Sequence, residues 1–305
     1  TKSKKTAYLS LIIALFNPWI WQNGRFAFDV FFSLWFYVLG IFIFLRNKNT
    51  WKLLSLIPFF LGFYCYQGFK LLLPLIAFLL FIFSLIKKNK LSFSGKQFKY
   101  NLLFFLSISA LFLFYLLYQL PTQQLSVARI ETQILLPNSE QISNVVNNDR
   151  RLTVSTNLSN LFINKYVQLG KEMLGRLMFV FGPRELFFEI NASNTSFAVW
   201  NHGIFYLIDA LLLLIGIFVL FRQKKHKIII FLGSFLLIGS LPVLITTSLW
   251  LYFRSSLIIP FLIIVMSIGW REILRKNQKV FIVSAIFYFI CVANFAFNYF
   301  FVFNF

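Results

Sequence analysis

The chain has 305 residues, of which 59% are hydrophobic, 20% aromatic and only 12% charged, and its mean hydropathy is +0.77. Soluble globular domains carry about twice that share of charged residues, so this composition excludes an ordinary water-soluble domain. The net charge of +20 comes from basic residues that stand in short clusters between apolar runs, so we interpret them as orientation signals in a membrane and not as a nucleic-acid surface.

Nine apolar runs recur along the sequence, and most are long enough as helices to cross a hydrocarbon core about 30 Å thick. They predict an all-α fold, a polytopic transmembrane helical bundle. The expected spans cover residues 6–21, 29–45, 53–66, 69–86, 101–120, 203–221, 228–249, 255–270 and 280–301. Five spans form an N-terminal group over residues 1–120, four form a C-terminal group over residues 203–305, and a polar loop over residues 121–202 separates the groups.

Five basic clusters between the spans hold 19 of the 29 basic residues. They cover Lys2–Lys5, Arg46–Lys52, Lys87–Lys99, Arg222–Lys227 and Arg271–Lys279. If every span crosses once, all five clusters lie on one side, as the tendency of Lys and Arg to stay cytoplasmic requires. We therefore predict a multi-pass protein of the cell (plasma) membrane, with cytoplasmic basic loops and an extracytoplasmic loop over residues 121–202.

This central loop is too long to be a simple connector. Its segments Leu174–Phe181 and Glu185–Phe188 are apolar enough to lie at the membrane interface, so we expect short interfacial helices there. Most of the acids fall on or near the outer face, which makes that face the place to expect chemistry. These acids are Asp29, Glu131, Glu140, Asp149, Glu172, Glu185 and Glu189.

The sequence lacks the signatures of several enzyme classes. Its two cysteines, Cys65 and Cys291, lie inside apolar segments, which leaves neither a disulfide framework nor a cysteine–histidine zinc site. It contains no GxxxxGK[ST], HExxH or GxSxG motif, so nothing in it supports a P-loop ATPase, a zinc protease or a serine hydrolase.

The first predicted outer loop reads NPWIWQNGRFAFD, from Asn17 to Asp29. Arg25 and Asp29 are four residues apart, and they would share one helix face at the outer boundary if the next helix starts early. One interpretation is an interfacial ion pair beside a tryptophan belt, with the acid at a helix N-terminus where the dipole favours it. The other is a site for a charged substrate, because charged side chains near lipid depth are costly.

A second polar cluster lies at the next predicted outer turn and comprises Tyr64, Tyr66, Gln67 and Lys70. Lys70 either extends toward the headgroups or meets a lipid phosphate, for which the tyrosines and the amide would supply hydrogen-bond partners.

Three further polar residues stand near the predicted outer ends of spans. Arg254 begins a span and His202 closes the central loop, and neither alone points to a chemistry. Asp209 lies about two turns into the span 203–221, where a buried acid is either paired within the bundle or functional; we expect a structural partner.

Several stretches together carry a family resemblance. NPWIWQNGRFAFDVFFSLWFYVLGIFIFL is followed by LGFYCYQGFKLLLPL, NKY at 164–166, FGPRELFFE at 181–189, HGIFYLIDALLLLIGIFVL at 202–220 and FRSSLIIPFLIIVMSIGW at 253–270. In this order and spacing they resemble the bacterial membrane glycosyltransferases of the GT-C type, in the dolichyl-phosphate-mannose protein mannosyltransferase group. The resemblance covers nearly the whole chain.

The resemblance implies an inverting glycosyltransferase that moves a sugar from a polyprenyl-phosphate donor to a protein, lipid or glycan acceptor at the outer face of the membrane. Asp29 matches the family's second acid and Arg25 the arginine before it. Such a site needs an acid to deprotonate the acceptor hydroxyl and cations to offset phosphate charge. The candidates for donor phosphate and lipid binding are Tyr64, Tyr66, Gln67, Lys70 and Arg254, and His202 is a further candidate. A divalent cation that bridges Asp29 and another acid is left open.

Family members carry their principal catalytic acid in the loop after their first span, and this sequence has no such loop ahead of its first run. The chain also begins with Thr1 and not with Met, and it ends at Phe305 without the family's outer soluble domain. We therefore expect the natural protein to extend further at both ends.

Two other functions fit the same composition. A polymerase or ligase of lipid-linked envelope polysaccharide would also carry outer arginines and a long outer loop. A transporter or flippase of lipid-linked substrates should show broken helices at the membrane midplane and a polar path through the bundle, whereas the polar residues here gather at one face.

Overall fold

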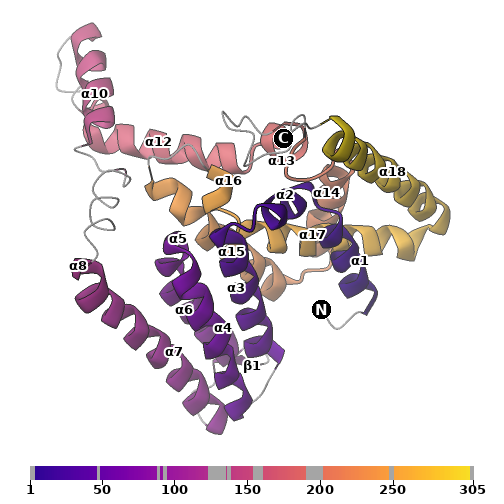
Figure 1. The fold of residues 1–305 in the computed structure, drawn as a ribbon, viewed down its shortest axis with the longest axis horizontal. Coiled ribbons are helices and arrows are strands. Elements are labelled where there is room, and N and C mark those ends of the chain that lie inside the picture. The colour runs from indigo at the N-terminus through magenta and orange to yellow at the C-terminus, as the bar shows by residue number, and fades with distance from the viewer. Residues whose placement is uncertain are drawn as a thin grey trace.

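The computed structural model describes residues 4–46, 49–87, 90–91, 95–122, 135, 139–153, 161–189, 202–246 and 251–302. These residues form helices joined by turns, with one antiparallel pair of two-residue strands, β1 (Ile86–Lys87) and β2 (Lys90–Leu91). The predicted helical fold is confirmed for the described residues (Figure 1). Lys2, Glu131 and the predicted end of a span at 247–249 lie outside them.

The helices divide into three stretches along the chain. The N-terminal stretch contains α1 (Lys4–Leu15), α2 (Pro18–Arg25), α3 (Asp29–Arg46), η1 (Asn49–Ser55), α4 (Leu56–Cys65), α5 (Gln67–Lys70), α6 (Leu72–Leu85), α7 (Lys96–Phe114), η2 (Tyr115–Gln119) and α8 (Leu120–Thr122). The central stretch contains α10 (Glu140–Leu152), α12 (Lys165–Val180) and α13 (Pro183–Phe187). The C-terminal stretch contains α14 (Leu207–Arg222), α15 (His226–Ile245), α16 (Leu251–Arg254), α17 (Ile258–Lys276), α18 (Gln278–Phe297) and η4 (Asn298–Val302).

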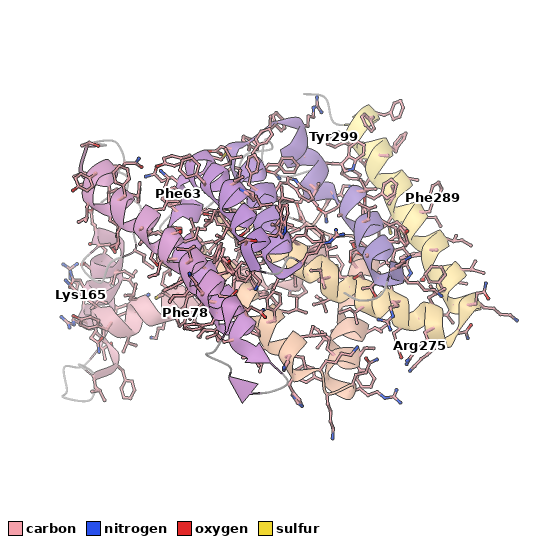
Figure 2. The ribbon with its side chains drawn as sticks, turned by 90° about the horizontal axis from the view of Figure 1, so that it is seen from below. Phe63, Phe78, Lys165, Arg275, Phe289 and Tyr299 are labelled. Carbon is pink, nitrogen blue, oxygen red and sulfur yellow. The ribbon has the colours of Figure 1, made fainter. Side chains whose placement is uncertain are left out.

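Five helical segments in the described part are long and apolar enough to cross a membrane. They are Asp29–Arg46, Gln67–Leu85, Gln97–Thr122, His226–Ile245 and Gln278–Phe301, and each coincides with one of the nine predicted spans. Their outer surfaces carry large apolar side chains, such as Phe289, which is 71% exposed and projects outward from α18 (Figure 2). These features are consistent with a membrane protein.

The other four predicted spans are not among these five segments, and local chemistry accounts for the difference. The span 6–21 is divided because Pro18 starts a new helix that Asn17 caps. α4 has ten residues and α14 has 16, which are fewer than a crossing of about 20 residues needs. α17 has 19 residues, but its last turns are charged, with Arg271, Glu272, Arg275 and Lys276.

α14 and α17 approach each other through glycines. A Cβ atom added to Gly216 would meet the carbonyl oxygen of Val265, and one added to Gly269 would meet the carbonyl oxygen of Leu212. Small residues permit such close backbone contact. These contacts run antiparallel, whereas nine alternating crossings would have the two segments run in the same direction, so strict alternation is not supported at this pair.

The helices form two groups that share one hydrophobic core. α3, α4, α6 and α7 lie side by side in one group, while α1, α14, α15 and α18 pack around α17 in the other (Figure 1). α15 joins the groups by packing on α6, where the ring centroids of Phe83 and Phe231 are 5.1 Å apart. α12 contacts α15 and α16, and α10 extends from α12 away from the rest of the molecule (Figure 1).

The central loop contains helices where interfacial helices were expected. α12 covers most of Leu174–Phe181, and α13 covers most of Glu185–Phe188. Asn164 caps α12 by accepting hydrogen bonds from the backbone nitrogens of Tyr166 and Val167, at 3.0 and 2.9 Å. The helices are confirmed, while their position at the membrane interface and the side of the membrane on which they lie stay predictions.

Candidate functional site

Asn17 fixes the first predicted outer loop to a distant segment. Its Oδ1 accepts a hydrogen bond from the backbone nitrogen of Ile20 at 2.9 Å, and its Nδ2 donates to the carbonyl oxygen of Ile204 at 2.9 Å. Asn17 is buried, and its bond to Ile204 is buried with it. α2 is thereby held against the segment that leads into α14.

Arg25 is the last residue of α2 and lies against aromatic rings. Its guanidinium carbon is 5.5 Å from the ring centroid of Tyr299 and 5.9 Å from that of Phe26, within the range of cation–π contacts. Ala27 then adopts a left-handed φ of 49°, which ends the helical run before Asp29 starts α3. Arg25 and Asp29 thus belong to different helices, and the condition that they share one helix face is not met.

Asp29 occupies the N-terminus of α3, where the helix dipole favours a carboxylate. Its Oδ1 accepts a hydrogen bond from the backbone nitrogen of Val30 at 2.8 Å. This contact agrees with the first interpretation of Asp29, an acid at a helix N-terminus.

Tyr66 links Asp29 electrostatically to Arg254. It lies between α4 and α5, and its ring packs edge-on against Phe253 at a centroid distance of 5.8 Å. Burial raises the pKa of Tyr66 to about 12, while the positive charge of Arg254 lowers that pKa and the negative charge of Asp29 raises it. Both charges therefore act on one phenol. Gly68 permits this arrangement, because a Cβ atom there would lie 2.6 Å from the Tyr66 ring.

Lys70 lies in an aromatic enclosure at the end of the same short segment. Its Nζ is 4.4 Å from the ring centroid of Tyr115, 5.4 Å from that of Phe63 and 5.7 Å from that of Tyr64. The residue is 6% exposed. Within the described ranges, Lys70 has no hydrogen bond or ion pair, and its ammonium group faces these aromatic rings.

Two amides hold the rings around Lys70. Gln67 donates from Nε2 to the hydroxyl of Tyr115 at 3.2 Å, and Gln119 donates from Nε2 to the hydroxyl of Tyr64 at 3.0 Å. The predicted cluster of Tyr64, Tyr66, Gln67 and Lys70 therefore divides: Tyr66 faces α16, and the other three face η2.

His202 belongs to a third group, beside the end of α18. Its Nε2 lies 3.5 Å from Nδ2 of Asn298, and its ring packs edge-on against Phe295 at 5.5 Å. Burial lowers the pKa of His202 below its usual value. Because Phe295 also packs on Tyr299, at 5.3 Å, His202 lies on the side of the site that Arg25 occupies.

Asp209 has the structural partner that we expected, although its place differs from the prediction. It lies in the first turn of α14 and not two turns into a span. Its Oδ2 accepts a hydrogen bond from the backbone nitrogen of Tyr206 at 3.0 Å, which closes a capping box at the start of the helix.

Arg176 is a buried cation that the sequence analysis did not identify. Its Nε and Nη2 donate to Oε1 of Glu172 at 3.2 and 3.0 Å, and its Nη1 donates to the carbonyl oxygen of Thr246. The spacing of four between Glu172 and Arg176 would have identified the ion pair, but Arg176 was grouped with an apolar segment.

Among the residues that the structure describes, no group of three or more His, Cys, Asp or Glu side chains could hold a metal ion, and a divalent cation stays an open question. No family model, curated protein or solved structure matches this chain. The class that the structure itself defines is thus a helical protein with five candidate membrane-crossing segments and a set of cations and aromatic side chains around residues 66–70.

Proposed function

We propose that this protein is a membrane glycosyltransferase that moves a sugar from a polyprenyl-phosphate donor to an acceptor at the outer face of the membrane. The observation that carries the proposal is the ammonium of Lys70, a residue only 6% exposed, which has aromatic rings around it and no anion partner in the described part of the chain. A cation left in this way offers charge-assisted hydrogen bonds to a phosphate. Arg254 and Asp29, whose charges both act on Tyr66, supply the second cation and the carboxylate of the proposal.

The proposed reaction forms one bond and breaks one bond. The acceptor oxygen bonds to the anomeric carbon of the sugar, the bond from that carbon to the phosphate oxygen breaks, and the acceptor proton passes to a carboxylate base. Lys70 and Arg254 stabilise the charge that gathers on the departing polyprenyl phosphate. Asp29 accepts a hydrogen bond from the acceptor hydroxyl, and Arg25, at the end of α2, is held against the ring of Tyr299.

The test uses the natural full-length protein in its native membranes, with a labelled polyprenyl-phosphate sugar as donor. Asp29→Asn should lower sugar transfer at least about 100-fold while membrane insertion is unchanged. Glu189→Gln is the matched control, because Glu189 is an exposed acid paired with Arg184 at 3.9 Å, and it should transfer at the normal rate.

Three results would oppose the proposal. Full turnover by Asp29→Asn would remove Asp29 from the site. Donor movement across the membrane without sugar transfer would favour a transporter or flippase. Products that lengthen by repeated units of a lipid-linked glycan would favour a polysaccharide polymerase or ligase.

A further inference from the structure

Hydrogen bonds join α1 to α17 so that their charged ends lie side by side. Ser10 donates from Oγ to Oγ of Ser267 at 2.8 Å, and Arg271 donates from Nη1 to Oγ1 of Thr6 at 3.4 Å. The two helices therefore run antiparallel, and the first turn of α1 lies beside the last turns of α17 (Figure 1). The first and the last of the five predicted basic clusters, which are at opposite ends of the sequence, meet in the fold.

The cations at this end of the helix pair form a surface that we call the basic patch. Its members are Lys4, Lys5, Arg271, Arg275, Lys276 and Lys279. All are exposed except Arg271, which is half-buried, and Arg275 lies at an edge of the molecule where α17 meets α18 (Figure 2). Glu272 is the only acid in the sequence of residues 1–10 and 267–284, so the basic patch has an excess of positive charge.

Glu272 accounts for two of these cations. It is buried, and its Oε1 lies 2.6 Å from Nη2 of Arg275 and 4.0 Å from Nζ of Lys276. Both partners are in the last turn of α17, where the helix dipole favours a cation. Arg275 and Lys276 therefore have a role within their own helix.

Three lysines of the basic patch have no such role. Lys4 and Lys5 begin α1, and Lys279 lies in the first turn of α18, where the helix dipole disfavours a cation. None of the three has an ion pair with another residue that the structure describes. Their charges are therefore available to an anion from outside the chain.

The basic patch borders an apolar surface. α18 lies within the candidate membrane-crossing segment Gln278–Phe301, and Lys279 is the second residue of that segment. The patch therefore lies at the depth of the lipid headgroups if this segment crosses the bilayer. Next to it, Tyr8 on α1 and Val283 on α18 are 65% and 66% exposed. A phospholipid has both an anionic group for the lysines and apolar chains for these side chains.

We propose that the basic patch binds the headgroup of an anionic phospholipid, whose acyl chains lie along the exposed apolar side chains of α1 and α18. Basic side chains next to a membrane surface attract anionic headgroups over about one Debye length, roughly 10 Å at 0.1 M salt. The residues of the basic patch are distinct from those of the proposed glycosyltransferase site, so the lipid binds whether or not the protein transfers a sugar.

Lipid titration of the purified full-length protein in a neutral detergent, followed by microscale thermophoresis, tests the proposal. Phosphatidylglycerol should bind at least about tenfold more tightly than phosphatidylcholine with the same acyl chains, because only the first has a net negative charge. This preference should largely disappear at 1 M salt, where the Debye length is about 3 Å. A preference that is absent at low salt, or unchanged at high salt, would overturn the proposal.

Inorganic phosphate separates a lipid from a free anion. An excess of inorganic phosphate should not displace phosphatidylglycerol, because phosphate lacks the acyl chains that contact α1 and α18. Complete displacement would show that a free anion is the ligand of the basic patch, and it would overturn the assignment to a lipid.

Charge-matched variants locate the binding. The triple variant Lys4→Gln/Lys5→Gln/Lys279→Gln should bind the two lipids within about twofold of each other, and its unfolding temperature should be unchanged because these side chains are exposed. Lys4→Arg/Lys5→Arg/Lys279→Arg keeps the charges and should keep the preference.

The matched control removes three exposed cations from the α14–α15 turn. Arg222→Gln/Lys224→Gln/Lys227→Gln lowers the net charge by the same amount and should keep the preference for phosphatidylglycerol. An equal loss of preference in both glutamine variants would assign the binding to the overall charge and overturn a site at the basic patch.

Discussion

Two lysines of this protein are buried to a similar extent but differ in the hydrogen-bond partners of their ammonium groups. Lys52 and Lys70 are 4% and 6% exposed, and each Nζ lies 4.4 Å from the centroid of one aromatic ring, Phe44 for Lys52 and Tyr115 for Lys70. Lys52 also donates a hydrogen bond to Oδ1 of Asn101 at 2.8 Å. Lys70 has no such acceptor among the described residues.

The comparison teaches that burial alone does not mark a functional cation. Lys52 joins η1 to the first turns of α7 through Asn101, so its charge serves the packing of two helical segments. Lys70 also contacts aromatic rings, yet its N–H donors have no acceptor among the described residues. The ammonium of Lys70 has no acceptor among the described residues and can donate to a phosphate, whereas Lys52 already donates to Asn101, which is why we place the donor phosphate at Lys70 and not at Lys52.

The largest expected effect separates the two lysines by substrate. Lys70→Met should weaken binding of the polyprenyl-phosphate donor about 100-fold, because loss of one partner from a buried charge pair costs roughly 2–5 kcal/mol. Lys52→Met should leave donor affinity unchanged. The measurement is titration of each purified variant with a fluorescent polyprenyl phosphate. Equal affinities for Lys70→Met and the wild-type protein would contradict our distinction between the two sites.

The second effect concerns stability and should appear at Lys52. Lys52→Met leaves the amide of Asn101 without its donor in a buried place, which should lower the free energy of unfolding by about 1–3 kcal/mol. The double variant Lys52→Met/Asn101→Leu removes both polar partners and should recover most of that loss. Thermal unfolding in detergent compares the three proteins, and a double variant no more stable than the single one would show that Asn101 is not the cause.

A smaller effect tests the aromatic ring beside each lysine. Tyr115→Leu should weaken donor binding about 3- to 10-fold by removing the ring surface that positions Lys70, since one cation–π contact contributes about 0.5–2 kcal/mol. Tyr115→Phe keeps that surface and should change binding less than twofold. Phe44→Leu is the matched change at Lys52 and should affect unfolding but not binding. Equal binding by Tyr115→Leu and Tyr115→Phe would show that the ring does not position the cation.

Periodicity and residue type predicted the helical class and most of the candidate residues, but not how those residues combine. Long apolar runs such as 29–45 became long helices because nothing in them interrupts backbone hydrogen bonding. The run 6–21 did not, because Pro18 starts a new helix there. A proline changes the hydropathy of an apolar run too little for the break to be predicted from hydropathy alone. Lys70 was identified as a candidate, but its enclosure depends on Tyr115, which is 45 residues away in the sequence, and no local pattern connects them.

The smallest expected effect is a pH dependence that belongs to Lys52. Burial lowers the pKa of Lys52 from 10.5 to about 8, so between these values the unfolded chain binds a proton that the folded chain does not. Because the unfolded state holds more protons in this range, the free energy of unfolding rises with pH. The contribution of Lys52 to that free energy is present above about pH 10 and is lost as the pH falls through about 8. The unfolding temperature should be higher at pH 9.5 than at pH 7 in the wild-type protein, and this difference should shrink in Lys52→Met. An equal difference in both proteins would assign the pH dependence to other groups and leave Lys52 as a charged, permanently paired residue.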